Sequence, residues 1–489
     1  MEIERSFDYD LFVIGGGSGG ISCAKKAAKL GAKVALADFV QPSPLGTKWG
    51  LGGTCVNVGC IPKKLMHHAS LMGEIKKDQV SAGWKIDPNA PHDWGHMMAI
   101  VNTHIKRLNW GYKKQLLEAK IKYFNCYATL KDKHTLMLKN KKGKVTEVTA
   151  ERIVLAMGGR PRYLNLENIY QLAITSDDIF WRKKIPGKTL VIGGGYIGLE
   201  CAGFLKGMGY EVDVLVRSVL LRGFDRDMVK RIYENMTHMG VKFERGSMTK
   251  IEKDGEGVKV QKRMQKNPDF IQGGVLEGME NREMIMSAKY DTVVLAIGRV
   301  PCTKNIGLDS VGVKLNQRGN VCVNHQYQTN IDSIYAIGDA VENSPELTPV
   351  AIKEGILLAK YMFEPSKSHR PINYNAIPTT VFSPLEYSKV GMSEEQAVAK
   401  YGAEGVEVYH SSFKPLEWNF YEGHKDNMCY SKVIVTRDEE EVVLGIHYIG
   451  PNAGEVMQGF ALALLRKTTF EDLKEISKQF CSKKLEYLK

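Results

Sequence analysis

The sequence predicts an α/β fold made of two parallel-sheet units, followed by an α+β region near the C-terminal end. The first reason is a strand–turn–helix–strand pattern that occurs twice, beginning near residues 9 and 189. The second is a change of composition near residue 368, after which alternating strand patterns replace the short apolar runs. The length of 489 residues is enough for roughly three domains of about 150 residues each.

The first unit begins with a short apolar run, Tyr9–Ile14, that ends at a cluster of glycines. Such a run is typical of a buried parallel strand. Residues 18–30 then place small and apolar residues at helical spacing, and Gly31 ends that helix. Val34–Ala37 is the next short strand. The order predicts a β-turn-α-β arrangement.

The glycine cluster of this unit fits the pattern G-x-G-x-x-G through Gly15, Gly17 and Gly20. These glycines allow a tight turn and a close approach of the backbone to a pyrophosphate at the N-terminus of the helix that begins at Ser18. The pattern alone is weak, but here it lies between a strand and a helix. Asp38, at the end of the next strand, can accept a hydrogen bond from a ribose hydroxyl. We therefore predict a Rossmann-like dinucleotide-binding domain rather than a loop that is merely rich in glycine.

The second unit repeats this order of elements. Thr189–Ile192 is predicted to be a strand, residues 199–207 a helix, and Val212–Val216 the following strand. The glycine pattern between the first strand and the helix consists of Gly193, Gly195 and Gly198. A second Rossmann-like domain follows from this repetition.

The end of the second strand distinguishes the two units. Arg217, Ser218 and Arg222 follow Val216, where an acidic residue would be expected to bind a free ribose 2′-hydroxyl. Arginine side chains suit a 2′-phosphate instead. The second unit is therefore predicted to bind NADPH rather than NADH, with surface charge as the alternative explanation of both arginines.

The remaining segments predict how the domains connect. Ile153–Leu155 and Thr292–Ile297 are apolar strands, and each precedes a turn, at 159–161 and 298–301, where we expect the chain to leave and re-enter the first domain. Residues 261–290 are polar and glycine-rich and predict a loop or a hairpin on the second domain. The α+β region is predicted from Val406–Tyr409, Lys432–Val435, Val442–Tyr448 and an apolar helix over 454–466. The expected domains are 1–162, 163–290, 291–367 (returning to the first domain) and 368–489.

Cys55 and Cys60 lie five positions apart in a segment that is rich in glycine and interrupted by proline. Two cysteines so spaced near a helix start can form a reducible disulfide, and the positive end of the helix favours a thiolate. The alternative, two inert core cysteines, is typical of isolated cysteine pairs. Because this pair closely follows a dinucleotide-binding turn, we predict that it is redox-active.

Composition limits the classes of function. The net charge of +12 arises from 67 basic and 55 acidic residues that are dispersed along the chain, which is typical of a solvated surface with a bias toward anionic partners. No basic stretch is interleaved with aromatic residues, so we do not expect nucleic-acid binding. No apolar run approaches the roughly 20 residues of a membrane span.

Cysteine and histidine usage point to compartment and metal content. Nine cysteines are an odd and scattered set, unlike a secreted disulfide scaffold, and the acidic start of the sequence resembles no targeting peptide. A cytoplasmic protein is expected, with a mitochondrial form left open. No metal site is expected, because the histidines lack ligand spacing: His67, His68, His410, His424 and His447.

The segment GGTCVNVGCIPKK, residues 52–64, resembles the active-site signature of the pyridine nucleotide–disulfide oxidoreductases, the family of glutathione and thioredoxin reductases. The preceding PLGTKWGLGG (44–53) resembles the large, animal-type thioredoxin reductases more than glutathione reductases. Further matching segments extend the resemblance from residue 7 to about residue 466: LNWGY (108–112), VRSVLLRGFD (216–225), YAIGD (335–339), ELTPVAI (346–352), PTTVFSPLEY (378–387), PLEW (415–418) and GPNAGEVMQGFA (450–461).

This resemblance implies an FAD-binding domain, an inserted NADPH-binding domain, a central return to the flavin and a dimerisation domain in a homodimer. Cys60 would be the thiol against the flavin, and Cys55 the thiol that exchanges with the substrate disulfide. Lys63 and Glu200 would form an ion pair near the flavin N5, with an ordinary ion pair as the alternative. The resemblance also implies cofactor contacts from Tyr196 (a lid over the nicotinamide), from Thr54, Gly158, Asp339, Thr348 and Pro349 (FAD), and from Gly298 and Arg299 (NADPH).

The C-terminal end departs from the family pattern. No His-Pro pair follows residue 447, whereas the family places its general acid/base there, and Cys481 stands alone rather than in a terminal redox pair. Such a base contributes about 10²–10⁴-fold to exchange. We therefore expect an intact flavin half-reaction and weakened turnover with thioredoxin, in a true variant or a mispredicted gene. The alternatives are a glutathione or other small-disulfide reductase, and a truncated flavoprotein with impaired disulfide turnover.

Overall fold

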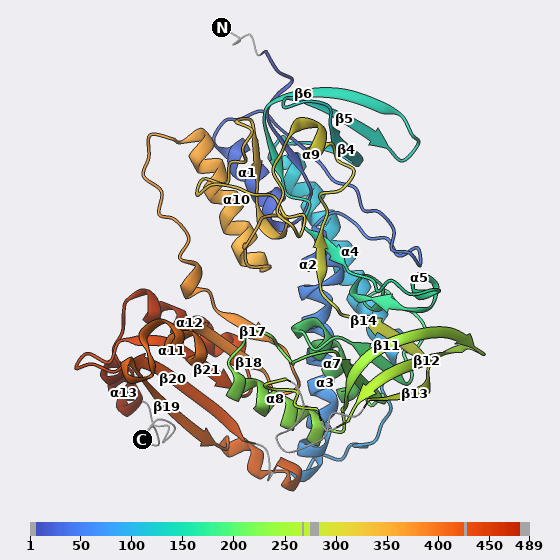
Figure 1. Cartoon of the computed structure of the whole chain (residues 1–489), viewed down its shortest axis with the longest axis vertical. Coiled ribbons are helices and arrows are strands. Elements are labelled where there is room, and N and C mark those ends of the chain that lie inside the picture. The colour runs from blue at the N-terminus through green and yellow to red at the C-terminus, as the bar shows by residue number, and fades with distance from the viewer. Residues whose placement is uncertain (1–5, 267, 274–282, 425–427, 480–489) are drawn as a thin grey trace.

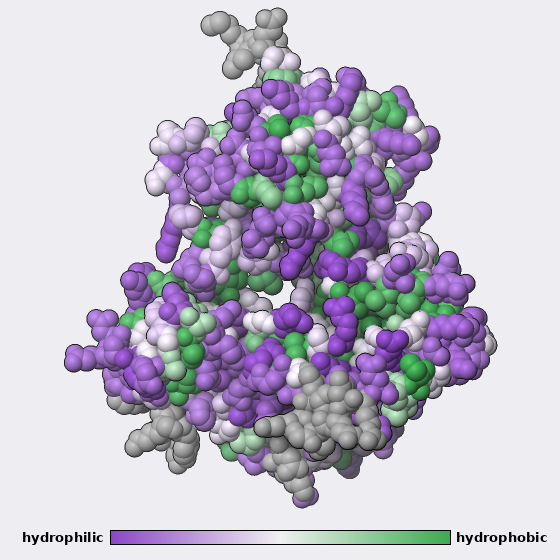
Figure 2. All heavy atoms as spheres, in the orientation of Figure 1, coloured by the Kyte–Doolittle hydropathy of each residue, from purple (hydrophilic) through white to green (hydrophobic). Residues whose placement is uncertain are grey.

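The computed structural model describes residues 6–266, 268–273, 283–424 and 428–479. Three parts are visible in Figure 1: a first-sheet unit at the top, a second-sheet unit at the lower right and a C-terminal unit at the lower left. The face shown in Figure 2 is mostly hydrophilic and is hollowed near its middle, where the first-sheet unit meets the two lower parts. No helix within the described ranges is long and apolar enough to span a membrane.

The first-sheet unit is built on strands in the order β3-β2-β1-β6-β5-β4, with β16 beside β6. β1, β2, β3, β6 and β16 pair in parallel, whereas β4 and β5 extend β6 as an antiparallel hairpin. The strands are β1 (Tyr9–Ile14), β2 (Val34–Ala37), β3 (Lys122–Phe124), β4 (Cys126–Leu130), β5 (Thr135–Asn140), β6 (Val145–Leu155) and β16 (Ile334–Ala336).

Helices cover both the sheet and the middle of the molecule. α1 (Ser18–Lys29) packs on α10 (Thr348–Phe363) through a shared apolar core with β1, because small residues on α1 allow a close approach. α3 (Cys60–Ser81) and α4 (Trp94–Glu118) run down the middle of Figure 1, between the first-sheet unit and the parts below. The other helices of this unit are α2 (Gly53–Val58), α9 (Leu308–Val311) and the short turn η1 (Gly338–Ala340).

The second-sheet unit has the strand order β13-β12-β11-β10-β9-β14-β8. The predicted strands β9 and β10 have the expected bounds, and the 261–290 segment contributes to a hairpin of β12 and β13. The predicted helix begins three residues earlier than expected, at Tyr196. The elements are α5 (Ile169–Leu172), β8 (Ile174–Thr175), α6 (Ser176–Ile179), β9 (Thr189–Ile192), α7 (Tyr196–Gly207), β10 (Val212–Val216), α8 (Arg226–His238), β11 (Lys242–Asp254), β12 (Gly257–Gln265), β13 (Glu283–Tyr290) and β14 (Thr292–Leu295).

Two observations refine the expected connections. β14 pairs in parallel with β9 and β8, so the second sheet extends to residue 295, beyond the boundary expected at 290. The reason is that β11–β13 form an antiparallel excursion from the sheet, after which the chain returns to its parallel centre. β7 (Gly159–Pro161) then pairs antiparallel with β15 (Arg299–Pro301), which places the predicted exit and return of the chain side by side.

The C-terminal unit is an antiparallel sheet in the order β17-β18-β21-β20-β19, and helices α12 and α13 pack on it around Phe470 and Met457. The predicted strands and helix of this α+β region are present. The elements are η2 (Tyr374–Ala376), β17 (Thr379–Val381), β18 (Tyr387–Gly391), α11 (Glu394–Tyr401), η3 (Ala403–Gly405), β19 (Val406–Phe413), η4 (Leu416–Asn419), η5 (Glu422–His424), β20 (Cys429–Thr436), β21 (Val443–Ile449), α12 (Ala453–Leu465) and α13 (Phe470–Gln479).

Candidate active site

The first glycine turn is shaped by the fold itself at two positions. Gly15 adopts a φ of +112°, and a Cβ there would collide with the carbonyl of Ala156. A Cβ on Gly20 would collide with the carbonyl of Gly15. Both positions therefore require glycine for the tight turn from β1 into α1.

Gly17 has a different explanation. Its φ of −82° suits any residue, and a Cβ there would meet only the Cα of Gly53 at 3.8 Å. Gly195 of the second turn has a φ of −81°, and a Cβ on it would meet nothing within 4 Å. Both residues cap their helices without a side-chain hydrogen bond. The space and the helix N-terminus suit a pyrophosphate at each turn.

Asp38 stands at the end of β2 beside the first turn. The backbone N–H of Gly16 donates to Asp38 Oδ1 at 2.9 Å, and burial raises the pKa of the Asp38 carboxyl. This contact leaves further acceptor capacity on the carboxylate for a ribose hydroxyl.

The equivalent position in the second unit carries no acid. Ile14 pairs with Ala37 in the first unit, and Ile192 pairs with Leu215 in the second, so Val216 stands where Asp38 stands. The next residues include Arg217 and Arg222, which are both exposed, and Arg222 Nη2 donates to Ser218 Oγ at 3.0 Å. This end of β10 therefore offers cations and a hydroxyl, the groups that a phosphate monoester would contact.

The two cysteines lie on consecutive helices. Cys55 is in α2, and Cys60 is the first residue of α3, at the positive end of that helix. The Cys55 thiol donates a hydrogen bond to Cys60, and this bond, together with the nearby Lys63 cation, lowers the pKa of Cys60 from 9.0 to about 6 despite desolvation. The same hydrogen bond and burial raise the pKa of Cys55. The reduced pair thus holds one proton, on Cys55, and a thiolate on Cys60 at neutral pH.

Lys63 and Glu200 meet across the boundary between α3 and α7. Lys63 Nζ lies 2.9 Å from Glu200 Oε1, and the Glu200 side chain is only 2% exposed. The neighbouring Glu200 carboxylate raises the pKa of Lys63 although burial alone would lower it. The pair predicted from the family resemblance is therefore present in the structure.

Phe382 is a contact of this ion pair that the sequence did not reveal. Its backbone N–H donates to Glu200 Oε1 at 3.0 Å, and Lys63 Nζ lies 4.9 Å from the centre of its ring. The residue belongs to the C-terminal unit, in the matching segment PTTVFSPLEY. Nothing in its residue type indicates the role, because a backbone N–H makes the hydrogen bond.

One cavity of about 620 Å³ joins these groups. Thr348 at the start of α10 lines it with its hydroxyl 3.7 Å from Cys60 Sγ, and Arg299 reaches Thr54 Oγ1 at 3.3 Å. The predicted residues that line the cavity are Gly15, Gly17, Ser18, Asp38, Thr54, Cys55, Cys60, Lys63, Gly158, Tyr196, Glu200, Arg299, Asp339 and Thr348.

The remaining predicted residues lie outside the lining of this cavity. They are Gly20, Pro349, Gly193, Gly195, Gly198, Arg217, Ser218, Arg222 and Gly298. Gly20, Gly193 and Gly198 shape the two turns, since added Cβ atoms there would collide with backbone carbonyls. Arg217, Ser218 and Arg222 lie beyond the second turn, after β10.

Asp339 lines the cavity from η1. Burial raises the pKa of its carboxyl. The preceding residue, Gly338, donates its backbone N–H at 2.7 Å to Glu354, a buried carboxylate of α10 that also accepts from Ser344 and Tyr374. Glu354 therefore fixes the turn that presents Asp339. Like Phe382, it is a residue of the site that the sequence pattern does not indicate.

In the described part of the chain, no group of three or more histidine, cysteine, aspartate or glutamate side chains is placed to hold a metal ion. His447 is wholly buried and hydrogen-bonded to Tyr387 and to the Met392 carbonyl, at 2.8 Å each. Cys481, on which the expectation about the C-terminal end rests, lies outside the described residues.

Comparison with known proteins places the chain in a family. Residues 9–355 match the pyridine nucleotide-disulphide oxidoreductase family, and residues 377–477 match the dimerisation domain of these enzymes. The chain therefore belongs to the pyridine nucleotide–disulphide oxidoreductases, flavoproteins that use a pyridine nucleotide. It is similar to the thioredoxin reductase SEP1 of Emiliania huxleyi, with 49% identity over 478 residues that cover 95% of this chain and 92% of that protein.

Proposed function

We propose that the chain is an NADPH-dependent FAD enzyme that reduces thioredoxin or a similar disulfide protein through Cys55 and Cys60. The observation that carries the proposal is the single cavity that contains both cysteines, the Lys63–Glu200 pair and the first glycine turn. The similarity to a thioredoxin reductase over nearly the whole chain supports the thioredoxin class and does not favour a glutathione reductase or an impaired variant.

The cofactors divide between the two glycine turns. FAD is proposed at the first turn, with Asp38 on its ribose and Asp339 toward its ribityl–phosphate region, because both carboxylates line the cavity. A flavin bound at the first turn would supply two-electron chemistry between a nicotinamide and the disulfide. NADPH is proposed at the second turn, with Tyr196 over the nicotinamide and Arg217 and Arg222 on the 2′-phosphate.

The residues of the chain control where charge and protons reside. Lys63 keeps a positive charge beside Cys60, which stabilises the thiolate formed when the disulfide opens. Cys55 keeps the proton and is therefore less ionised than Cys60 at neutral pH. Before Cys55 attacks a substrate disulfide, its proton must leave. Each turnover converts NADPH, one proton and one disulfide into NADP⁺ and two thiols.

The remaining proposals concern organisation. A homodimer is proposed because a dimerisation domain is present. The NADPH-binding domain is proposed to extend from 163 to the end of β14 at residue 295, and the FAD-binding domain to combine residues 1–162 with 296–367. The dimerisation domain is proposed to begin near 368. A cytoplasmic location is proposed from the odd and scattered cysteines.

The test is turnover of the purified holoprotein with NADPH and either thioredoxin or glutathione disulfide. NADPH oxidation that requires thioredoxin, with little rate from glutathione disulfide, supports the proposal, and mass spectrometry of the released cofactor should identify FAD. Cys55→Ser and Cys60→Ser should each abolish turnover, whereas Cys322→Ser, a cysteine outside the cavity lining, should retain it. Turnover that survives either active-site substitution would refute the role of the pair.

A further inference from the structure

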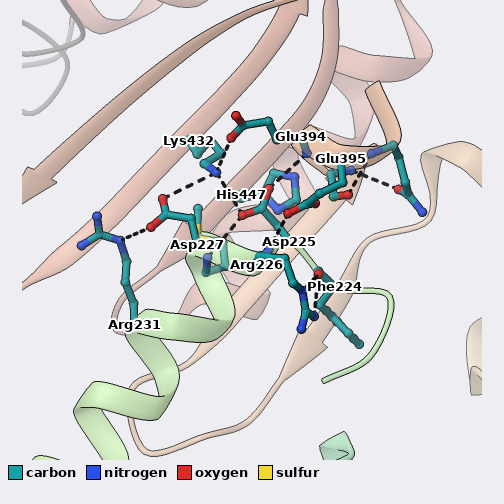
Figure 3. Close-up of polar contacts among 12 residues, drawn as sticks. Phe224, Asp225, Arg226, Asp227, Arg231, Glu394, Glu395, Lys432 and His447 are labelled. Atoms are coloured by element: carbon teal, nitrogen blue, oxygen red, sulfur yellow. Dashed lines mark hydrogen bonds and ion pairs between the residues drawn. The ribbon is translucent and has the colours of Figure 1, made fainter. Parts of the chain in front are cut away.

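A buried ion cluster connects the C-terminal unit to the loop that follows β10 (Figure 3). Lys432, on β20, is at its centre, and its side chain is 3% exposed. Its Nζ lies 2.8 Å from Glu394 Oε2, 3.0 Å from Asp225 Oδ1 and 3.5 Å from Asp227 Oδ2. Burial alone would lower the pKa of Lys432, but the Asp225 and Glu394 carboxylates raise it well above its usual value. One permanent cation thus joins carboxylates of both units.

Asp225 is the point at which the cluster reaches the loop. Its side chain is completely buried, caps α8 by accepting from the Met228 N–H at 3.3 Å, and accepts from the Glu394 N–H at 3.1 Å. His447 lies opposite Lys432 in the sheet, but burial lowers the pKa of His447 to about 4, so this ring is neutral at physiological pH. Lys432 is therefore the charge that compensates the buried Asp225.

Arg226 fastens the loop itself. Its guanidinium donates to the carbonyls of Leu220 at 3.0 Å, Leu221 at 2.5 Å and Phe224 at 2.7–2.9 Å. The backbone N–H of Arg226 donates to Glu395 Oε1 of the C-terminal unit at 2.9 Å. The loop is thus wrapped around one side chain whose own backbone is held by α11.

The same loop carries the groups proposed to bind the 2′-phosphate. Arg222 and Ser218 are joined by a hydrogen bond of 3.0 Å. The Leu221 N–H donates to the carbonyl of Gly194, in the second glycine turn, at 2.8 Å. Leu221 adopts a φ of +39°, a conformation that a β-branched or bulky residue holds only when its surroundings fix it. The position of Arg222 relative to the glycine turn therefore depends on contacts at both ends of the loop.

We propose that Lys432 is a positioning residue that acts through Asp225 and Arg226 to hold the Arg217–Arg222 loop in the geometry that binds the 2′-phosphate of NADPH. The preference for NADPH over NADH would then depend on the C-terminal unit, more than 200 residues further along the chain. This inference rests on the proposed NADPH site. A displacement of about 1 Å is enough to lower activity up to about 10²-fold, so a loosened loop should weaken phosphate recognition measurably.

The test compares Lys432→Met with the wild-type holoenzyme, using a chromogenic aromatic disulfide as the electron acceptor. We expect the KM for NADPH and the inhibition constant of adenosine 2′,5′-bisphosphate to rise about tenfold. The KM for NADH and the inhibition constant of AMP should stay unchanged, since neither ligand carries a 2′-phosphate. The kcat should also stay unchanged, because the loop does not contact the reacting groups. Equal rises for NADPH and NADH, or no rise for either, would overturn the inference.

Two further variants guard against a folding defect. Glu395→Ala removes the exposed carboxylate that accepts from the Arg226 N–H, and it should lower the NADPH-to-NADH preference without a change in Tm. Arg437→Met is the matched control, because it breaks an exposed ion pair with Glu407 in the same unit, and its preference should equal that of the wild type. If Lys432→Met does not fold, an unchanged preference in Glu395→Ala overturns the inference.

Arg222→Ala separates this inference from the proposed function. A wild-type enzyme that prefers NADPH, and that loses this preference in Arg222→Ala, confirms the phosphate site. An unchanged preference in Lys432→Met and Glu395→Ala would then refute the positioning role alone. A wild-type enzyme without preference for NADPH would refute both.

Discussion

Replacing Lys63 should make the Cys60 thiolate less stable. The pKa of Cys60 is lowered to about 6, so about half of this thiol is ionised at pH 6. Lys63→Met removes a cation and leaves the Glu200 carboxylate, which opposes the thiolate, without its partner. An opposite charge within reach lowers a pKa by about 1–3, and we take the lower end because Cys60 is exposed.

The expected magnitude follows from these values. A rise of about 1 in the pKa of Cys60 reduces the thiolate fraction at pH 6 from about 50% to about 10%. Since only the thiolate is alkylated, the rate of Cys60 modification by iodoacetamide at pH 6 should fall about fivefold. The assay is peptide-resolved mass spectrometry of the reduced protein over pH 5–9.

Two substitutions control this measurement. Lys64→Met removes the neighbouring cation, which pairs with Glu386 at 3.4 Å and Glu455 at 3.2 Å, and should leave the Cys60 profile unchanged. Lys63→Arg keeps the charge and should resemble the wild type. If the profile of Lys63→Met superimposes on that of the wild type, with its midpoint still near pH 6, then the assignment of Lys63 as the stabilising cation is wrong.

Two other predictions follow from the same geometry. Gly17→Ala should fold with an unchanged Tm but bind FAD about tenfold more weakly or worse, because its Cβ enters space that no protein atom uses. Gly15→Ala should weaken FAD binding and also lower the Tm, since its Cβ meets the Ala156 carbonyl. Flavin content and melting curves of the two variants test this prediction, and an equal Tm for Gly17→Ala and Gly15→Ala would contradict it. The pKa of His447 is lowered to about 4. The contribution of the neutral ring to the free energy of unfolding is therefore fully present above pH 6.5 and is lost as the pH falls toward 4. Relative to His447→Gln, the wild type should lose about 3 kcal/mol of unfolding free energy between pH 7 and pH 4, as measured by urea unfolding, and parallel pH profiles would refute the assignment.

The two dinucleotide-binding units were predictable because their signals are local. A parallel strand buried on both faces needs an uninterrupted apolar run, and the following turn needs glycine where a Cβ would strike a carbonyl. Tyr9–Ile14, Thr189–Ile192 and Val212–Val216 therefore have the bounds that their patterns predict. The boundary at 290 was less predictable, since the return of β14 to the second sheet depends on pairing with β9, a hundred residues earlier.

The sequence by itself determined the two glycine turns, the acid of the first unit, the arginines of the second and the presence of a cysteine pair near a helix start. These features are set by chain neighbours a few residues apart. Only the tertiary structure decided what surrounds them. Phe382 donates a backbone N–H to Glu200, and Lys432 compensates Asp225, across sequence separations of 182 and 207 residues. The physical reason is that a backbone donor or a buried charge has no residue pattern of its own, and its partner is fixed only when distant elements pack together.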